Sequence, residues 1–264
     1  MKVLIIAGHG GTPYDPGAVG CGYTEAVETR RMANAVALLL RAYGFEVALY
    51  DQSKDAYKVV TQGGSLPLTG VSYVLEFHLN SAANDPGGNG VTTGTEIFVH
   101  TNEQGVTVEQ AILRRVCVLG FKNRGVKRSS GLAVLKYVVN RGVSHALVEM
   151  CFIDDRDDMN LYGRKFDAIA RAIADGVAEG FGKSVQDDKE DDTVTQTEFN
   201  AMYDKANPLY KKINDVPSYW QQEVREMLDC GAINGGTDIN PDDVNMRHEA
   251  LQAAIVAYRA AVNK

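Results

Sequence analysis

The sequence has no long apolar run, no pattern typical of a leader peptide at its start and no excess of basic charge. No apolar run reaches the ~18 residues of a membrane span. Met1-Lys2 leads straight into a short apolar stretch without a cleavage site, so we expect synthesis in the cytoplasm without a signal peptide. The net charge is −7: residues 185–264 carry 15 acidic and 8 basic side chains, while residues 1–184 carry 19 of each. Phosphate binding needs a basic face, which argues against nucleic acid as the main partner.

Paired cysteines and phosphate-binding motifs are also missing. The four cysteines are far apart and form no CxxC pair, which argues against a zinc finger or a disulfide framework. The glycine-rich segment GHGGTPYDPGAVG has neither a GKS or GKT ending nor GxGxxG spacing, so it does not predict a nucleotide site. What remains is the composition of a soluble globular protein, with 45% hydrophobic and 23% charged residues.

An apolar stretch at the start of the chain predicts the centre of the fold. Residues 3–6 are typical of a strand buried on both faces of a parallel sheet, and the glycines that follow permit a tight turn. Further strands are expected at 45–50, 71–79, 95–100 and 146–153, and helices at 25–43, 106–119 and 161–181. Strands that alternate with helices predict an α/β fold, a mostly parallel twisted sheet with helices on both faces.

A change in composition near residue 183 predicts a domain boundary. Residues 183–197 contain a dense acidic run and almost no bulky apolar residue, which is typical of a solvated linker. We therefore expect one domain over residues 1–182 and a small, mainly helical domain over 198–264. A domain that small has a marginal core, so a homodimer through it, or its packing on the first domain, would add burial.

Three residues are candidate metal ligands. His9 follows the first strand and His78 lies near the end of the strand at 71–79; in an open α/β sheet, ligands bind at the carboxyl ends of the strands. Glu25 begins a helix, and its carboxylate is either a metal ligand or only a favourable partner of the helix dipole. Glu28, one turn later, is a competing candidate for the metal. Two histidines and a carboxylate suit zinc, with one coordination position left for water.

Glu149 stands inside the apolar segment ALVEMCFI. A charge in the middle of a buried strand costs several kcal/mol unless it has a partner, and a metal-activated water would be such a partner. Glu149 is therefore a candidate general base, with a half-buried position at the sheet edge as the alternative.

Four blocks of sequence resemble the zinc-dependent N-acetylmuramoyl-L-alanine amidases of the Amidase_3 type. They are GHGGTPYDPGAVGCGYTEAV, EFHLNSAAN, NRGVKR with LAVLK, and ALVEMCFIDD, and they cover about residues 1–182 in order. The resemblance implies that His9, Glu25 and His78 bind zinc, which favours Glu25 over Glu28. It also implies that Glu149 is catalytic, and that the enzyme cleaves the amide between N-acetylmuramic acid and L-alanine of peptidoglycan.

Further contacts with the substrate are expected around this site. Asn80 follows the second histidine, Glu96 lies on a neighbouring strand, and Arg124 belongs to a small basic cluster that would contact peptide carboxylates. A solvated surface role is the alternative for Arg124. Structural or surface roles are expected for His100 and His145.

The C-terminal segment resembles a surface-layer-homology unit. The resemblance rests on Asp215-Val216, Trp220, the glycines at 231–236, Arg247 and Glu249. Such units attach proteins to cell-wall polysaccharide, so Tyr219, Trp220 and Arg247 are expected to bind a secondary wall polymer. The alternative is that Trp220 anchors a small core.

Together these patterns favour a phage endolysin that lyses a Gram-positive host. Without a signal peptide, such a protein would stay in the host cytoplasm until a holin released it to the wall. Two alternatives remain, a zinc peptidase that cuts stem-peptide bonds and a wall-binding protein without activity.

Overall fold

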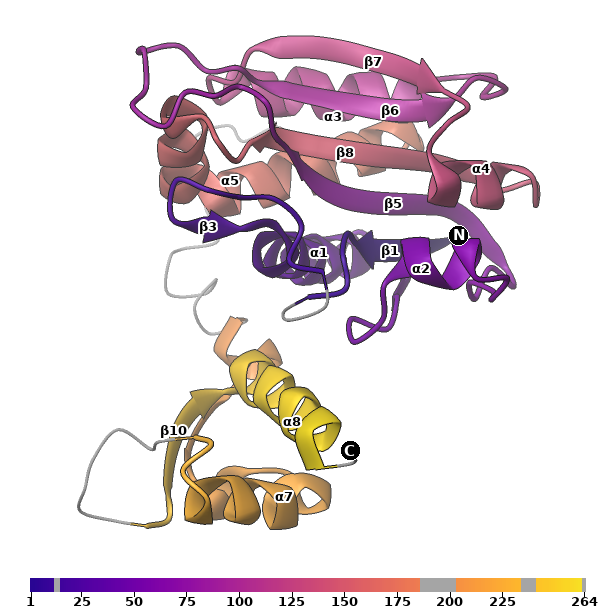
Figure 1. The fold of residues 1–264 in the computed structure, drawn as a ribbon. Coiled ribbons are helices and arrows are strands. Elements are labelled where there is room, and N and C mark those ends of the chain that lie inside the picture. Colours follow the sequence, from indigo (N-terminus) through magenta and orange to yellow (C-terminus); the bar gives the residue numbers. More distant parts are fainter. Residues whose placement is uncertain (12–14, 186–202, 234–240, 263–264) are drawn as a thin grey trace. The chain divides into compact units, whose positions relative to one another are not determined.

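The computed structural model describes residues 1–11, 15–185, 203–233 and 241–262, and it divides the chain into two compact units (Figure 1). The first unit is Met1–Val185 and the second is Gln186–Lys264. Most of the linker predicted at 183–197 lies outside the described residues. No helix in the described parts of the chain combines the length and the apolar character that a membrane span needs.

The first unit is a six-stranded sheet between two layers of helices (Figure 1). Its strands are β1 (Lys2–Ala7), β4 (Glu46–Leu49), β5 (Val71–Asn80), β6 (Thr95–His100), β7 (Asn123–Ser129) and β8 (Ser144–Phe152). Its helices are α1 (Glu25–Ala42), α2 (Ala56–Thr61), α3 (Thr107–Val118), α4 (Ala133–Val139) and α5 (Arg156–Gly180). The strand order is β4-β1-β5-β8-β6-β7; the first four run parallel, and β6 runs antiparallel to β8. The predicted mostly parallel α/β sheet is confirmed.

The two faces of the sheet carry separate cores, because side chains alternate along a strand. Val3 and Ile5 of β1 pack into the core that contains α1, α3 and α5. Leu4 and Ile6 point the other way, into the core under α2 and α4. The strand is therefore apolar throughout, as a central strand covered on both faces must be.

The sequence did not predict some of the elements. β7 has the sequence NRGVKRS and pairs only with β6, at the edge of the sheet. Edge strands carry charged side chains that discourage pairing with other chains, so β7 shows no apolar pattern. The small helix α2 and a two-stranded hairpin of β2 (Val19–Gly20) and β3 (Tyr23–Thr24) were missed too. α5 begins five residues before the predicted 161, because Asp155 caps its first turn.

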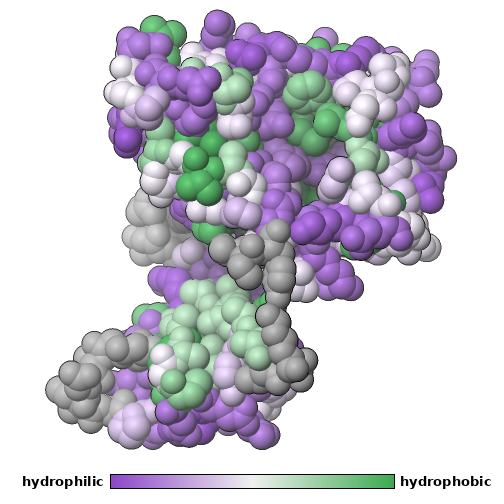
Figure 2. Space-filling model, in the orientation of Figure 1, coloured by the Kyte–Doolittle hydropathy of each residue, from purple (hydrophilic) through white to green (hydrophobic). Residues whose placement is uncertain are grey.

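The described residues of the second unit include the helices α7 and α8 and a small sheet. Its elements are β9 (Leu209–Lys212), η1 (Ile213–Asp215), α7 (Ser218–Asp229), β10 (Asp243–Arg247) and α8 (His248–Val262). The mainly helical character is as expected, but the antiparallel pair of β9 and β10 was not predicted. Tyr210, Val224 and Leu251 belong to its separate core. Figure 2 shows a pale green, apolar surface over α8, on which Val256 is exposed.

Candidate metal centre

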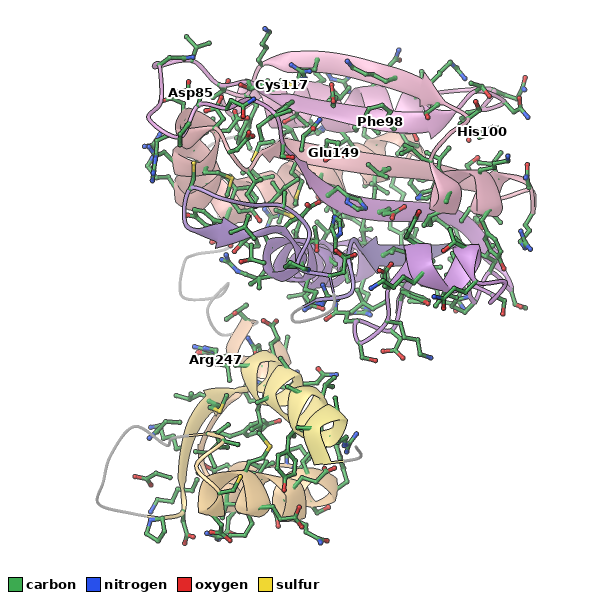
Figure 3. The ribbon with its side chains drawn as sticks, viewed as in Figure 1. Asp85, Phe98, His100, Cys117, Glu149 and Arg247 are labelled. Carbon is green, nitrogen blue, oxygen red and sulfur yellow. The ribbon has the colours of Figure 1, made fainter. Side chains whose placement is uncertain are left out.

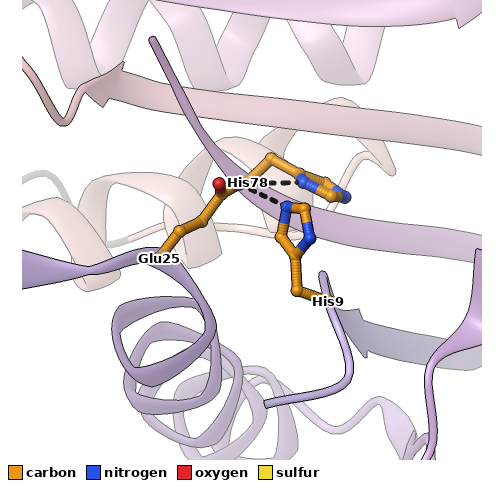
Figure 4. Close-up of side chains that lie close together, drawn as sticks. All are labelled: His9, Glu25 and His78. Atoms are coloured by element: carbon orange, nitrogen blue, oxygen red, sulfur yellow. Dashed lines mark hydrogen bonds and ion pairs between the residues drawn. The ribbon is translucent and has the colours of Figure 1, made fainter. Parts of the chain in front are cut away.

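His9, Glu25 and His78 converge beside the carboxyl ends of β1 and β5 (Figure 4). His9 Nε2 and His78 Nδ1 each lie 3.0 Å from the same oxygen, Glu25 Oε1. The two imidazole rings meet edge to face, with their centroids 5.0 Å apart. Three potential ligand atoms thus face one small volume, and all three belong to residues that the sequence singled out.

Two glycines make room for these rings. An added Cβ at Gly8 would lie within 2.7 Å of three ring atoms of His78. An added Cβ at Gly17, whose φ is +67°, would lie 2.7 Å from His9 Cδ2 and 2.8 Å from Glu25 Oε2. Real Cβ atoms essentially never make contacts that short, so the site requires glycine at both positions.

Glu25 is fixed at the start of α1 by main-chain groups. The N–H of Leu79 donates to Oε1, and the N–H of Ala18 donates to Oε2. Burial alone would raise the pKa of Glu25, but its contacts with His78 and His9 outweigh burial and hold the pKa far below its usual range. The competing Glu28 accepts from Arg31 and from the Tyr162 hydroxyl instead. The structure therefore brings Glu25, not Glu28, to the histidines.

A second carboxylate lies behind each histidine. Asp15 lies 3.1 Å from His9 Nδ1, and Glu76 Oε1 lies 3.1 Å from His78 Nε2. A carboxylate that accepts from the outer ring nitrogen leaves the inner nitrogen unprotonated and free to bind a metal. For Glu76, burial would raise the pKa, but contacts with His145 and His78 lower it to about 2. Neither carboxylate was predicted, although Glu76, a charge within the apolar run VSYVLEFHL, repeats the signal that identified Glu149.

The donor set fits a zinc ion. Tetrahedral zinc with bonds of about 2.0–2.1 Å holds its ligand atoms about 3.3 Å apart. The 3.0 Å spacings around Glu25 are close to that value. Burial lowers the pKa of both His9 and His78, but the carboxylates around them more than offset it, so both pKa values are raised. The same carboxylates that favour a proton on these rings would favour a divalent cation between them.

Glu149 lies on β8 directly beside His78, its register partner on β5 (Figure 3). Its Oε2 is buried and has no hydrogen-bond partner among the described residues. Burial raises the pKa of Glu149 to about 7; His78 counteracts this, while Glu25, Glu96 and Glu76 add to it. A carboxyl group that titrates near neutrality can both accept and return a proton, as a general base must.

The predicted substrate residues gather around Glu96, which pairs with Glu149 across β6 and β8. Asn80 Nδ2 donates to Glu96 Oε1 at 2.7 Å. Arg124 Nε lies 2.8 Å and Lys127 Nζ 3.1 Å from Glu96 Oε2. The structure thus brings Asn80, Glu96 and Arg124 together next to Glu149, in one hydrogen-bonded group.

His100 and His145 lie elsewhere. β6 runs opposite to β8, so His100, at the carboxyl end of β6, lies far from Glu149 in Figure 3. His145 is completely buried on β8, and its Nε2 lies 3.0 Å from Glu76 Oε2. It therefore contacts the centre only through Glu76.

A second acidic group serves the loop 81–94. The oxygens of Asp85, Asp155 and Asp157 are close enough together to hold a metal. However, Asp155 and Asp157 already accept main-chain N–H groups of this loop, and Asp154 accepts three more. The acidic run after β8 thus fastens the loop that leads into β6.

The predicted wall-binding residues differ in exposure. Tyr219 is 70% exposed, and its ring meets Trp220 edge to face. Trp220 packs against the small core and lies 5.0 Å from the ring of His248. Arg247 pairs with Asp204 at 2.7 Å (its position is labelled in Figure 3). Of the three, only the side chain of Tyr219 is mostly exposed.

An α/β sheet with two histidines and a carboxylate at its strand ends is an arrangement typical of metallohydrolases. The chain belongs to the Amidase_3 family, N-acetylmuramoyl-L-alanine amidase, whose model matches residues 3–179. "Probable autolysin PH" of Staphylococcus aureus is 28% identical over 191 residues, which are 67% of this chain and 38% of that protein. This chain therefore spans well under half the length of that relative.

Two solved structures show the same fold. The amidase AmiC2 of Nostoc punctiforme superimposes with a TM-score of 0.55 at 22% identity, covering 69% of this chain and 98% of that one. The catalytic domain of the CD27L endolysin, which targets Clostridia difficile, gives a TM-score of 0.54 at 22% identity, covering 70% and 99%.

Proposed function

We propose that this protein is a zinc-dependent amidase that cleaves the bond between N-acetylmuramic acid and L-alanine in peptidoglycan. The observation that carries this is the convergence of His9 Nε2, His78 Nδ1 and Glu25 Oε1, with the buried Glu149 on the adjacent strand. Membership of the Amidase_3 family supports the same bond.

Each residue then has a defined task. His9, Glu25 and His78 would hold the zinc ion, which when bound polarises the substrate carbonyl and acidifies a water. Glu149 takes a proton from the attacking water and passes it to the departing amine of L-alanine. In the protein without metal, burial raises its pKa to about 7, which makes this carboxylate a better proton acceptor than a solvated glutamate.

We assign the contact with the stem peptide to the group around Glu96. Arg124 has a side chain that is 28% exposed, and its guanidinium lies 4.7 Å from the centre of the Phe152 ring. Anchored by Glu96, it offers its remaining N–H groups to a peptide carboxylate. Asn80, held by the same carboxylate, supplies a neighbouring amide.

The second unit is assigned to wall binding, and the whole protein to phage lysis. Tyr219 offers an exposed ring on which a sugar can stack, next to Trp220. The catalytic domain of an endolysin is among the solved structures of this fold. In this context the protein is made in the host cytoplasm and reaches the wall through a holin. Expression of the full chain with and without a holin tests this: lysis without the holin would contradict it.

The activity is tested by digesting purified Gram-positive peptidoglycan and identifying the products by mass spectrometry. We expect peptides with free N-terminal L-alanine, and loss of this release when a chelator removes zinc. Glu149→Gln should lower the rate about 10²–10⁴-fold, because the general base is lost, while zinc stays bound. Glu109→Gln is the matched control, since Glu109 is also a buried carboxylate but bonds to Tyr73, away from the ligands.

Other outcomes of the digestion would support a different function. New termini within the stem peptide would identify a peptidase. Full activity of Glu149→Gln, or activity that survives complete removal of metal, would overturn the assignment. No release from walls of several species, together with binding to them, would identify a wall-binding protein.

A further inference from the structure

Two buried polar side chains on neighbouring strands lie behind His78. Glu76 is 3% exposed and His145 is not exposed at all. Glu76 and His78 are two residues apart on β5, so their side chains point to the same face of the sheet. His145 is the register partner of Val74 on β5, which places it on that face as well. The row runs from the metal centre into the core that α2 and α4 cover.

The contacts along this row are continuous. His78 Nδ1 lies 3.0 Å from Glu25 Oε1, on the side of the metal centre, and His78 Nε2 lies 3.1 Å from Glu76 Oε1. The other oxygen of Glu76 lies 3.0 Å from His145 Nε2. Glu76 therefore joins two histidines, of which only one faces the metal centre.

Burial of these groups needs a compensating role. An unpaired polar or charged group costs free energy when it leaves water. Within the described parts of the chain, neither the ring nitrogens of His145 nor Glu76 Oε2 make a well-formed hydrogen bond, so their 3.0 Å contact with each other is what compensates for their burial. For stability alone, apolar side chains at both positions would serve as well as a buried ion pair.

We propose that Glu76 is a positioning residue that fixes the ring of His78, and that His145 holds Glu76 in place for this task. This rests on the proposed function, in that His9, Glu25 and His78 hold zinc. Glu76 accepts a hydrogen bond from the Nε2–H of His78, which keeps the lone pair of Nδ1 directed at the metal. His145 restrains the carboxylate through its second oxygen, so that Glu76 cannot turn away.

The structure contains a matched pair without this task. Glu109 on α3 is 4% exposed, and its Oε1 lies 2.6 Å from the hydroxyl of Tyr73, a residue of the same strand as Glu76. Tyr73 lies in the core on the opposite face of the sheet. Glu109 is a buried carboxylate like Glu76, and its partner Tyr73 lies on the same strand as Glu76. Among the contacts that the structure gives, neither Glu109 nor Tyr73 touches the metal centre.

The test measures zinc affinity by competition with a chromophoric chelator, in the full chain, without reference to catalysis. Glu76→Gln should weaken zinc binding about 10–100-fold, because the amide can donate to His78 Nε2 and shift the ring proton to Nδ1. His145→Leu should act in the same direction but less strongly. The double variant should bind zinc as Glu76→Gln does, because His145 acts only through Glu76. Glu109→Gln should bind zinc like the wild type.

Cobalt absorption gives a second, structural readout. In the Co²⁺-loaded protein, the visible spectrum should change for Glu76→Gln and stay unchanged for Glu109→Gln. Only Glu76→Gln changes a residue that contacts a candidate ligand, His78. If Glu76→Gln fails to fold, His145→Leu carries the same comparison.

The outcomes separate this inference from the function on which it rests. Wild-type zinc affinity and spectrum in both Glu76→Gln and His145→Leu would overturn the inference alone. Additive losses of zinc affinity in the double variant would show that His145 does not act through Glu76. A wild-type protein that binds no zinc would overturn the proposed function.

Discussion

His9 and His78 occupy equivalent places around Glu25, yet the two sides of the centre are built differently. His9 stands in a turn after β1, and its supporting Asp15 belongs to the same loop, with 28% of its side chain exposed. His78 stands within β5, and its supporting Glu76 has only 4% exposed. The loop side is partly open to water and local in sequence; the strand side is more deeply buried and is built from two strands, β5 and β8.

This difference predicts how each side tolerates change. Water can replace a hydrogen bond that is lost at an exposed position, and a loop can shift to relieve a clash. A buried strand can do neither, because a group left unpaired there keeps its full desolvation cost and packed interiors transmit strain. The strand side should therefore respond more strongly than the loop side to equivalent substitutions.

The largest difference is expected between Gly8→Ala and Gly17→Ala. Gly8→Ala drives a methyl group into the ring of His78 and should weaken zinc binding on the order of 1,000-fold, since about 10–16 kcal/mol of zinc affinity is shared among three protein ligands. Gly17→Ala clashes with His9 and Glu25, but its loop can move, so its loss should be smaller. Zinc competition measures both.

Two further glycines are matched controls. Gly105 lies in open space without a positive φ, and Gly22 lies in open space at φ +89°. Gly105→Ala should leave zinc affinity unchanged, and Gly22→Ala should cost stability only. The comparison fails if Gly17→Ala loses as much affinity as Gly8→Ala.

The next effect concerns Glu149, on the strand side, and the stability of the metal-free protein. Its carboxyl pKa rises from 4.5 to about 7 on folding, so the folded protein keeps the proton while the unfolded chain loses it. The wild type should therefore lose stability relative to Glu149→Gln as the pH rises from 4.5 to 7, by about 3 kcal/mol in total. Above pH 7 the difference should stay constant.

Denaturant unfolding of both proteins in the presence of a chelator measures this difference. A constant difference across that range would mean that Glu149 is solvated or paired in the folded protein.

The smallest effect is expected at Asp15. Asp15→Asn removes the charge behind His9. Because this side chain is partly exposed, solvent water can accept the hydrogen bond from Nδ1–H in its place. Zinc affinity should fall only a few-fold, well below the 10–100-fold loss at Glu76→Gln. Measured side by side in one competition assay, equal losses for the two variants would remove the distinction between the loop side and the strand side.

Much of this centre is visible in the sequence, because its signals are local. An apolar strand that stops at a histidine, as at residues 3–9, predicts both a buried strand and a functional end. Glu149 was visible for a related reason, since a charge inside ALVEMCFI has no place in a core without a partner. Both signals need only a few consecutive residues.

What the sequence did not predict depends on pairing between distant strands. Glu76 and His145 are far apart in the chain, and their contact exists only because β5 lies beside β8. His145 alone reads as an ordinary buried histidine. The reversal of β6, which brings Glu96 to Glu149, likewise depends on strand order rather than on any pattern within TGTEIFVH.

Because β6 is reversed, the candidate metal ligands and the group around Glu96 come from different parts of the sheet. The candidate metal ligands come from the turn after β1, from α1 and from β5, whereas Glu96 and Arg124 reach the site from the beginnings of β6 and β7. The loop 81–94, which leads into β6, can therefore vary in length and composition while the ligand strands keep their register. The residues around Glu96 can thus change independently of His9, Glu25 and His78.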